Sequence, residues 1–149
     1  ILQDNMRNGQ ETVIIVDEAH VIKDELVFEQ LRLLLNFQLR DRFMLTLLLL
    51  GQPELKQKIE DNKPLDQRIA FKYFLEALPL DDTAKYIQHR LAVADVKKQI
   101  FTDEAIGSIH KHSGGIPRLI NNLCDLCLLV GANNKASAID GEIVKQAIS

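Results

Sequence analysis

The sequence is poor in cysteine and in aromatic residues, and it contains no tryptophan. Two cysteines in 149 residues cannot build a disulfide scaffold, and they fit a reducing compartment. The longest apolar run, residues 43–50, is far shorter than the roughly 20 residues that a membrane-spanning helix needs. No basic segment followed by an apolar stretch opens the chain, so we expect no export signal in it.

Basic residues are not in excess. Residues 1–80 hold 10 Lys/Arg against 13 Asp/Glu, residues 81–149 hold 8 against 8, and the formal net charge is −3. Proteins that bind the phosphate backbone of nucleic acids tightly usually carry an excess of positive charge. The charge therefore disfavours a general nucleic-acid binder, although it leaves room for a small basic patch.

An apolar content of 46% with 26% charged residues predicts a folded chain with a buried core. Residues 12–16 are apolar and β-branched without polar alternation, which is typical of a strand covered on both faces. Further strands are expected at 43–50 and at 69–75, and helices at about 24–35 and 54–59. This order with short connections predicts an α/β fold with a parallel sheet.

The pattern changes after Pro79, where only helical periodicity follows. Asp81 or Asp82, Thr102 and Asp140 are expected to cap helices, and another helix is expected to begin near Pro117. We therefore expect two parts, an α/β part over residues 1–79 and a small helical bundle over residues 80–149.

Two carboxylates, Asp17 and Glu18, follow the first predicted strand directly. Ligands of open parallel sheets bind beyond the carboxyl ends of the strands. In a phosphoryl-transfer site Asp17 would hold the hydration shell of Mg²⁺, and Glu18 would orient or deprotonate the attacking water. The alternative is that the pair only begins a loop and caps the next helix.

Three further polar residues are candidates for the same chemistry. Gln52, in Gly51-Gln52-Pro53, would position the water or contact a γ-phosphate, or it belongs to an ordinary turn. Arg68 has a planar guanidinium suited to phosphate and would serve the site of a neighbouring subunit, or it is a surface residue paired with Asp66. Arg118, expected in the first turn of a helix, would bind an anion there or form a salt bridge.

Cys124 and Cys127 form a Cys-x-x-Cys pair inside a predicted helix. No second cysteine pair accompanies them, and the position is not the helix N-terminus that lowers a thiol pKa. Packing in the core is the favoured interpretation, and a zinc or redox site is the alternative.

Four segments in this order resemble the AAA+ ATPases. Val13 to His20 resembles a Walker B motif, Gly51 to Leu55 the sensor 1 segment, Leu65 to Ile69 the segment of the arginine finger, and Gly114 to Asn121 the sensor 2 helix of the lid. Within this class the segments resemble those of the general secretion pathway protein A-like ATPases, which have relatives in pilus biogenesis. The resemblance extends over residues 10–148.

The resemblance implies ATP and Mg²⁺ as cofactors, and it gives each candidate residue a role. Asp17 would coordinate Mg²⁺ through water, Glu18 would act on the attacking water, and Gln52 would be the sensor 1 residue. Arg68 would complete a neighbouring subunit's site, and Arg118 would contact the nucleotide from the lid. It also implies self-association into a ring or oligomer, secretion or pilus apparatus proteins as partners, and a cytoplasmic ATPase domain attached to the bacterial inner membrane.

A P-loop, Gly-x-x-x-x-Gly-Lys-[Ser/Thr], is missing from the sequence, because none of the seven glycines opens this pattern. In the family it precedes Walker B, so we expect a fragment that begins after it and that binds and hydrolyses ATP poorly by itself. In the family the P-loop strand lies between the strands expected at 43–50 and 69–75. Without it we expect these two strands to pair with each other, or two copies of the chain to pair edge to edge.

Two other functions stay open at this point. A branch related to the secretion ATPases selects targets in DNA transposition, and strongly salt-dependent DNA binding would identify it. The second alternative is an oligomerisation module without catalysis.

Overall fold

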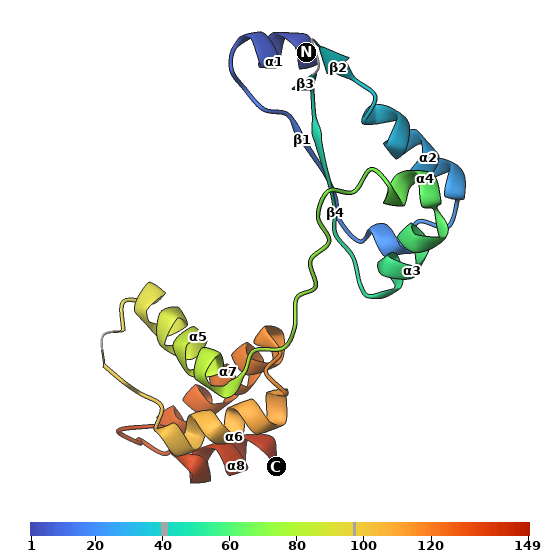
Figure 1. The fold of residues 1–149 in the computed structure, drawn as a ribbon. Coiled ribbons are helices and arrows are strands. Elements are labelled where there is room, and N and C mark those ends of the chain that lie inside the picture. Colours follow the sequence, from blue (N-terminus) through green and yellow to red (C-terminus); the bar gives the residue numbers. More distant parts are fainter. Residues whose placement is uncertain (40–41, 97) are drawn as a thin grey trace. The chain divides into compact units, whose positions relative to one another are not determined.

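The structure is a computed structural model that describes residues 1–39, 42–96 and 98–149. It divides into two compact units, Ile1–Tyr73 and Phe74–Ser149, which are described here one at a time (Figure 1). The division falls in the segment that leads to Pro79, where the sequence places the start of the helical part. The functional subdivision into 1–79 and 80–149 stays a prediction.

The first unit combines a small parallel sheet with short helices, as the sequence predicts. Its elements are α1 (Leu2–Arg7), β1 (Val13–Val16), the 3₁₀ helix η1 (Ala19–Val21), α2 (Glu25–Leu34), β2 (Gln38–Leu39), β3 (Arg42–Phe43), β4 (Thr46–Leu49), α3 (Glu54–Asp61) and α4 (Lys63–Asp66). The side chain of Asp24 caps α2, because its Oδ1 accepts a hydrogen bond from the N–H of Leu26 at 2.9 Å.

Strands β1 and β4 pair in parallel, from Val13 opposite Thr46 to Val16 opposite Leu49. Figure 1 shows them side by side, with α3 following directly on β4. Phe28, Ile59 and Leu65, from α2, α3 and α4, form the small core on which Leu49 packs. Alternate side chains of the sheet point the other way, and Val13, Ile15 and Leu48 are exposed there.

The strand expected at 43–50 is shorter than predicted. Only Thr46–Leu49 pairs with β1, whereas Arg42–Phe43 pairs antiparallel with Gln38–Leu39. Met44 and Leu45, between the two segments, are buried. The apolar run at 43–50 therefore predicts correctly that Met44 and Leu45 are buried. It does not reveal that the residues before and after them pair with different strands.

The prediction of a third strand at 69–75 is wrong, because residues 71–79 form no regular element. Phe71, Tyr73 and Leu75 have exposed fractions of 93%, 86% and 92%. A strand exists only where another strand offers its backbone groups, and among the described residues β4 pairs with β1 alone. The predicted pairing of 43–50 with 69–75 is therefore also wrong, while edge-to-edge pairing of two copies stays a prediction.

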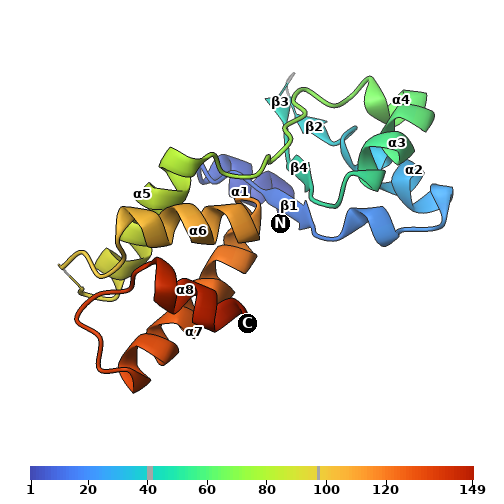
Figure 2. The same cartoon turned by 90° about the horizontal axis from the view of Figure 1, so that it is seen from below.

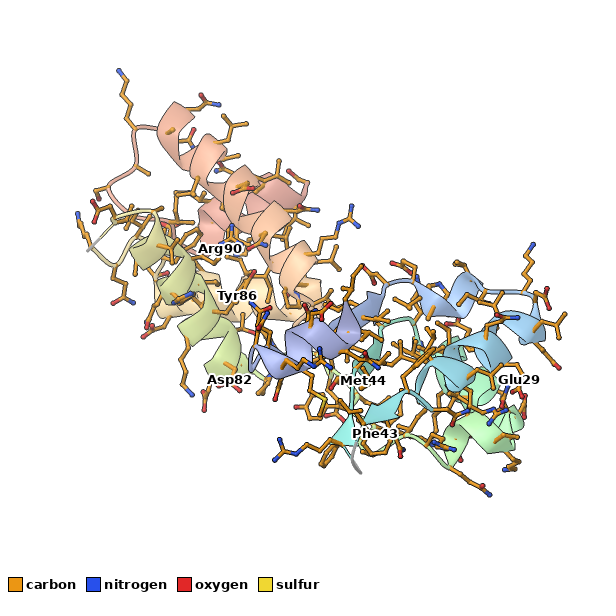
Figure 3. The ribbon with its side chains drawn as sticks, turned by 90° about the horizontal axis from the view of Figure 1, so that it is seen from above. Glu29, Phe43, Met44, Asp82, Tyr86 and Arg90 are labelled. Atoms are coloured by element: carbon orange, nitrogen blue, oxygen red, sulfur yellow. The ribbon has the colours of Figure 1, made fainter. Side chains whose placement is uncertain are left out.

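The second unit is helical, as predicted. It contains α5 (Leu80–Val93), α6 (Asp103–Ser113), α7 (Pro117–Asn133) and α8 (Gly141–Ile148). Both ribbon views show α6, α7 and α8 packed on one another (Figures 1 and 2). Its core includes Phe101, Ile109, Ile120 and Val144, all almost fully buried. The hydroxyl of Tyr86, labelled in Figure 3, donates a hydrogen bond to Oδ1 of Asn121 at 3.1 Å and joins α5 to α7.

Helix caps in the second unit agree with the sequence at two of three positions. Thr102 Oγ1 accepts from the N–H of Ala105, and Asp140 Oδ1 accepts from the N–H groups of Glu142 and Ile143. The expected cap by Asp81 or Asp82 is wrong, because the helix begins earlier, with Pro79 at the N-cap position. Both aspartates lie in the first turn, where a negative charge favours the helix dipole.

A close backbone contact fixes the entry to this unit. The N–H of Leu78 donates to the carbonyl of Gly115 at 2.9 Å. A Cβ atom at residue 115 would lie 2.1 Å from the carbonyl oxygen of Leu78, and φ of Gly115 is 75°. Only glycine combines this conformation with so near a neighbour. No described helix is both long and apolar enough to cross a membrane.

Replacing Gly115 by alanine should lower the free energy of unfolding by about 2–4 kcal/mol, through backbone strain and overpacking. Gly107→Ala is the matched control, because Gly107 lies inside α6 with no atom within 4 Å of an added Cβ. That change should raise the free energy of unfolding by about 0.5–1 kcal/mol. Urea unfolding followed by circular dichroism measures both, and equal effects of the two changes would contradict this account.

Candidate functional site

The two predicted carboxylates lie at the carboxyl end of β1, and both side chains are exposed. Glu18 adopts a left-handed backbone conformation (φ 52°, ψ 33°), which is uncommon for a residue other than glycine. Its N–H donates to Oδ1 of Asp17 at 2.8 Å. This bond occupies one carboxylate oxygen of Asp17 and turns the chain sharply into η1. The alternative of a side-chain helix cap is not realised, since Glu18 makes no side-chain cap bond to η1.

Gln52 lies beside this turn, because the hydrogen bonds between the strands continue beyond their ends. The N–H of Leu50 donates to the carbonyl of Val16 at 2.9 Å, and the N–H of Ala19 donates to the carbonyl of Leu50 at 2.8 Å. The turn that contains Gly51 and Gln52 is thereby held against the segment that follows β1. The structure thus brings three of the predicted site residues to one edge of the sheet.

His20 connects the two turns, a role that the sequence did not reveal. Its Nδ1 lies 3.2 Å from Oε2 of Glu18 and 3.3 Å from the backbone N of Gln52. Gly51 makes this approach possible, since a Cβ there would be 3.2 Å from N and 3.3 Å from Nδ1 of His20.

Lys58 is a second residue that sequence reasoning missed. Its ammonium group donates to the carbonyls of His20 and Ile22, the latter at 2.6 Å. These carbonyls belong to the end of η1, where a positive charge is favoured. Helical spacing places Lys58 next to the apolar face of α3, one residue before the buried Ile59, but it does not indicate which carbonyls the ammonium group contacts.

Arg68 lies just after α4 in the same unit, with an exposed side chain. The ion pair that was considered for it does not form, because Asp66 pairs with Lys72 instead. Within the described residues no hydrogen bond or ion pair joins Arg68 to Asp17, Glu18 or Gln52. The structure therefore leaves the guanidinium available at the surface.

Arg118 belongs to the second unit and lies in the first turn of α7, exposed. Of the two interpretations, the salt bridge to a nearby acid is absent among the described residues. Gly114 ends α6 in a left-handed conformation (φ 58°), and Pro117 at the first position of α7 preorganises the turn that precedes Arg118.

The edge of the sheet that carries Asp17 and Glu18, called the acidic edge below, fits Mg²⁺ only when further ligands come from outside this chain. Within residues 1–39, 42–96 and 98–149 no cluster of three or more His, Cys, Asp or Glu side chains could hold a metal ion. Mg²⁺ in nucleotide sites is bound by one or two carboxylates together with phosphates and water. Asp17, exposed and with Oδ2 not used by the bond to Glu18, matches that requirement.

The Cys-x-x-Cys pair packs in the helical core, as favoured from the sequence. Cys127 is fully buried and Cys124 packs against the same cluster. Burial raises the pKa of Cys124 to about 12, and burial also raises the pKa of Cys127. Both thiols therefore stay protonated near neutral pH, unlike a redox or metal-binding thiolate.

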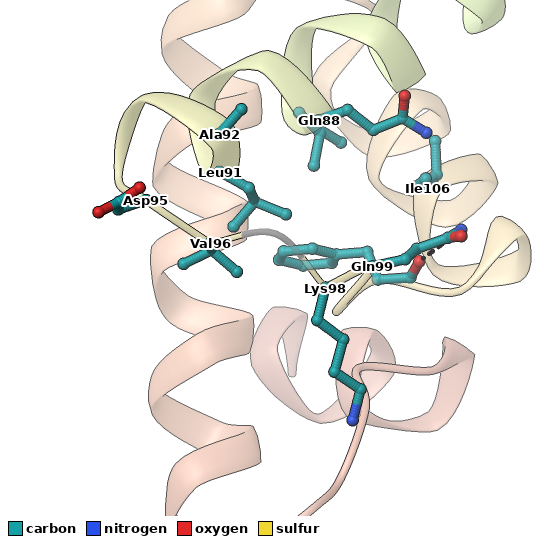
Figure 4. A pocket seen from close by; sticks show the side chains of 10 residues that line it. Gln88, Leu91, Ala92, Asp95, Val96, Lys98, Gln99 and Ile106 are labelled. Atoms are coloured by element: carbon teal, nitrogen blue, oxygen red, sulfur yellow. Dashed lines mark hydrogen bonds between the residues drawn. The ribbon is translucent and has the colours of Figure 1, made fainter.

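An open groove of about 570 Å³ lies in the second unit, between the end of α5 and the segment that follows it. Figure 4 shows apolar and polar side chains mixed in its lining, with Ile106 beside Gln88 and Gln99, and Leu91 and Val96 across from them. None of the predicted site residues lines it.

Comparison with known proteins identifies the class. The family model described as an AAA domain matches residues 1–59. Among solved structures, the RuvB Holliday junction branch migration motor of Thermotoga maritima superposes with a TM-score of 0.70 at 20% identity, over 99% of this chain and 48% of that chain. A RuvB variant from the same source reaches 0.71 at 21% identity with the same coverage. The parallel sheet followed by a helical unit is thus an AAA+ fold.

A curated relative narrows the assignment. General secretion pathway protein A of Aeromonas hydrophila is 40% identical over 143 residues, which are 93% of this chain and 26% of that protein. The chain belongs to the AAA+ proteins of the general secretion pathway protein A family. It spans about a quarter of the length of this relative.

Lys58→Met should lower the free energy of unfolding of the first unit by about 1–2 kcal/mol, because the carbonyls of His20 and Ile22 lose their donor. Lys63→Met in the same unit is the control, since the Lys63 side chain is exposed on α4. That change should alter stability by less than about 0.5 kcal/mol. Hydrogen exchange of residues 19–22 separates the two variants, and equal protection would contradict the assignment.

The raised pKa values of the two cysteines predict slow alkylation. At about pH 8 the thiolate fraction of Cys124 is so small in the folded chain that iodoacetamide should modify it more than about 100-fold slower than in denaturing urea. Mass spectrometry of quenched samples gives both rates. Similar rates in the folded and unfolded chain would show that Cys124 is not protected as the structure implies.

Proposed function

We propose that this chain is the Walker B, sensor 1 and lid part of an ATPase that hydrolyses ATP to drive the assembly of a secretion or pilus apparatus. The observation that carries the proposal is the acidic edge, where Asp17 and Glu18 follow a parallel strand and lie beside the turn of Gln52. The 40% identity to a protein named general secretion pathway protein A supports the secretion role.

Each residue has a chemical task in this proposal. Asp17 holds the hydration shell of Mg²⁺ with its open carboxylate oxygen, and Glu18 accepts a proton from the attacking water or orients that water. Mg²⁺ held there with the nucleotide would supply positive charge against the transferred phosphate. Gln52 contacts the water or the γ-phosphate, and its position beside His20 and Glu18 supports this.

We assign two arginines to the proposed ATPase site as well. Arg68 serves the site of a neighbouring subunit, which agrees with its exposed position after α4. Arg118 contacts the nucleotide from the lid, which agrees with its exposed place at the start of α7. Self-association into a ring or oligomer therefore belongs to the proposal, because Arg68 acts only across an interface between subunits.

No P-loop pattern occurs in this sequence. We therefore propose that the isolated chain binds ATP weakly and hydrolyses it negligibly, and that activity belongs to a longer protein with a P-loop. We place that protein's ATPase domain in the cytoplasm, attached to the bacterial inner membrane, with secretion or pilus apparatus proteins as partners. The near-neutral charge disfavours nucleic acid as a partner.

The test is Glu18→Gln in a P-loop-bearing protein that contains this chain. Loss of the proton acceptor should lower the ATP turnover number by about 100-fold or more, while the Kd for a fluorescent ATP analogue stays within about threefold. Glu54→Gln is the control, because Glu54 is an exposed carboxylate in the first turn of α3. Unchanged turnover in Glu18→Gln would refute the role of Glu18 and with it the proposed function.

A further inference from the structure

One ring nitrogen of His20 faces two partners that make opposite demands on it. Oε2 of Glu18, at 3.2 Å, accepts hydrogen bonds, whereas the N–H of Gln52, at 3.3 Å, donates them. A ring nitrogen carries either a hydrogen or a lone pair, so Nδ1 satisfies one of these partners at a time. The contact with Glu18 and the contact with Gln52 are therefore mutually exclusive as hydrogen bonds.

The surroundings of His20 hold the ring where both partners reach it. Lys58 fixes the backbone carbonyl of His20, and the buried Ala19 precedes it in the turn. The His20 side chain is 15% exposed, while the Glu18 side chain is 61% exposed. The histidine is thus the fixed member of the pair, and the Glu18 carboxylate can move into solvent when Nδ1 does not hold it.

We propose that His20 is a positioning residue that couples the Gln52 turn to the Glu18 carboxylate. When the N–H of Gln52 donates to Nδ1, the ring carries its hydrogen on Nε2, and Glu18 is released to accept a proton from water. When the Gln52 turn moves away, Nδ1–H donates to Glu18 and occupies one of its oxygens. The consequence for hydrolysis rests on the function proposed above, but the coupling itself is a property of this chain.

The coupling is measurable in the chain without nucleotide. Glu18→Ala removes the competitor for Nδ1, so the hydrogen bond from the Gln52 amide should strengthen. We expect a downfield shift of the Gln52 amide proton, slower exchange of that proton, and the Nε2–H tautomer of His20 in ¹⁵N spectra. In a His20→Phe background, Glu18→Ala should leave the Gln52 amide unchanged, because the ring there offers no nitrogen.

Glu54→Ala controls for a charge effect, since it removes a carboxylate two residues from Gln52. Any shift that it produces at the Gln52 amide should be the same with His20 or Phe at position 20. A response of Gln52 to Glu18→Ala that persists in the His20→Phe background would overturn the proposal. His20→Asn guards against a fold defect of the phenylalanine variant, because its amide group lies close to the place of Nδ1 and should preserve the response.

The kinetic consequence is tested in the P-loop-bearing protein. His20→Phe removes the acceptor that holds the Gln52 turn beside Glu18. It should therefore lower the ATP turnover number by about tenfold with little change in KM, and His20→Asn should restore most of it. Equal turnover numbers for the wild type and His20→Phe would refute the positioning role. The two proposals fail separately. Unchanged ATP turnover in Glu18→Gln would refute the proposed ATPase function but not the coupling of the Gln52 amide to Glu18. A Gln52 amide that does not respond to Glu18→Ala would refute only the role of His20.

Discussion

The parallel pairing of β1 with β4 is the constraint on which the candidate site depends. The register sets Val16 opposite Leu49, so both strands end at the same level of the sheet. The hydrogen bond from Ala19 to Leu50 continues the pairing by one more step. A slip of one residue would turn each side chain of β1 to the opposite face and separate the acidic turn from the turn of Gln52.

The segment after β1 contains only the short helix η1, and contacts of individual residues stabilise it. Glu18 holds a left-handed conformation, which costs about 1 kcal/mol or more for a residue with a Cβ atom. The bond of its N–H to Asp17, the burial of Ala19 and the two carbonyl bonds of Lys58 offset that cost. The turn therefore holds the backbone of Glu18 in a defined conformation, from which its side chain reaches His20. A defined starting position is what positioned acid–base chemistry needs.

The sequence predicted best those features that depend on residues close together in the chain. Asp24 and Thr102 cap helices as expected, because capping depends on residues that are close in the sequence. The β-branched run before Asp17 became a strand because β4 supplies its partner. Residues 69–75 have the composition of a strand, but a strand requires a partner that the described chain does not offer. The contact of His20 with Gln52 and that of Lys58 with Ile22 join residues more than 30 positions apart, and sequence spacing carries no information on such pairs.

The two units differ in how completely they bury their apolar side chains. The helical unit has a core that extends through α5 to α8, whereas the core of the first unit rests on Phe28, Ile59 and Leu65. One face of its two-stranded sheet is exposed, and so small a sheet is only marginally stable by itself. The turn of Asp17 and Glu18 follows β1 directly, so the geometry of this turn is only as stable as the β1–β4 pairing. Any segment that covers the exposed face would stabilise the candidate site without contacting a single residue in it.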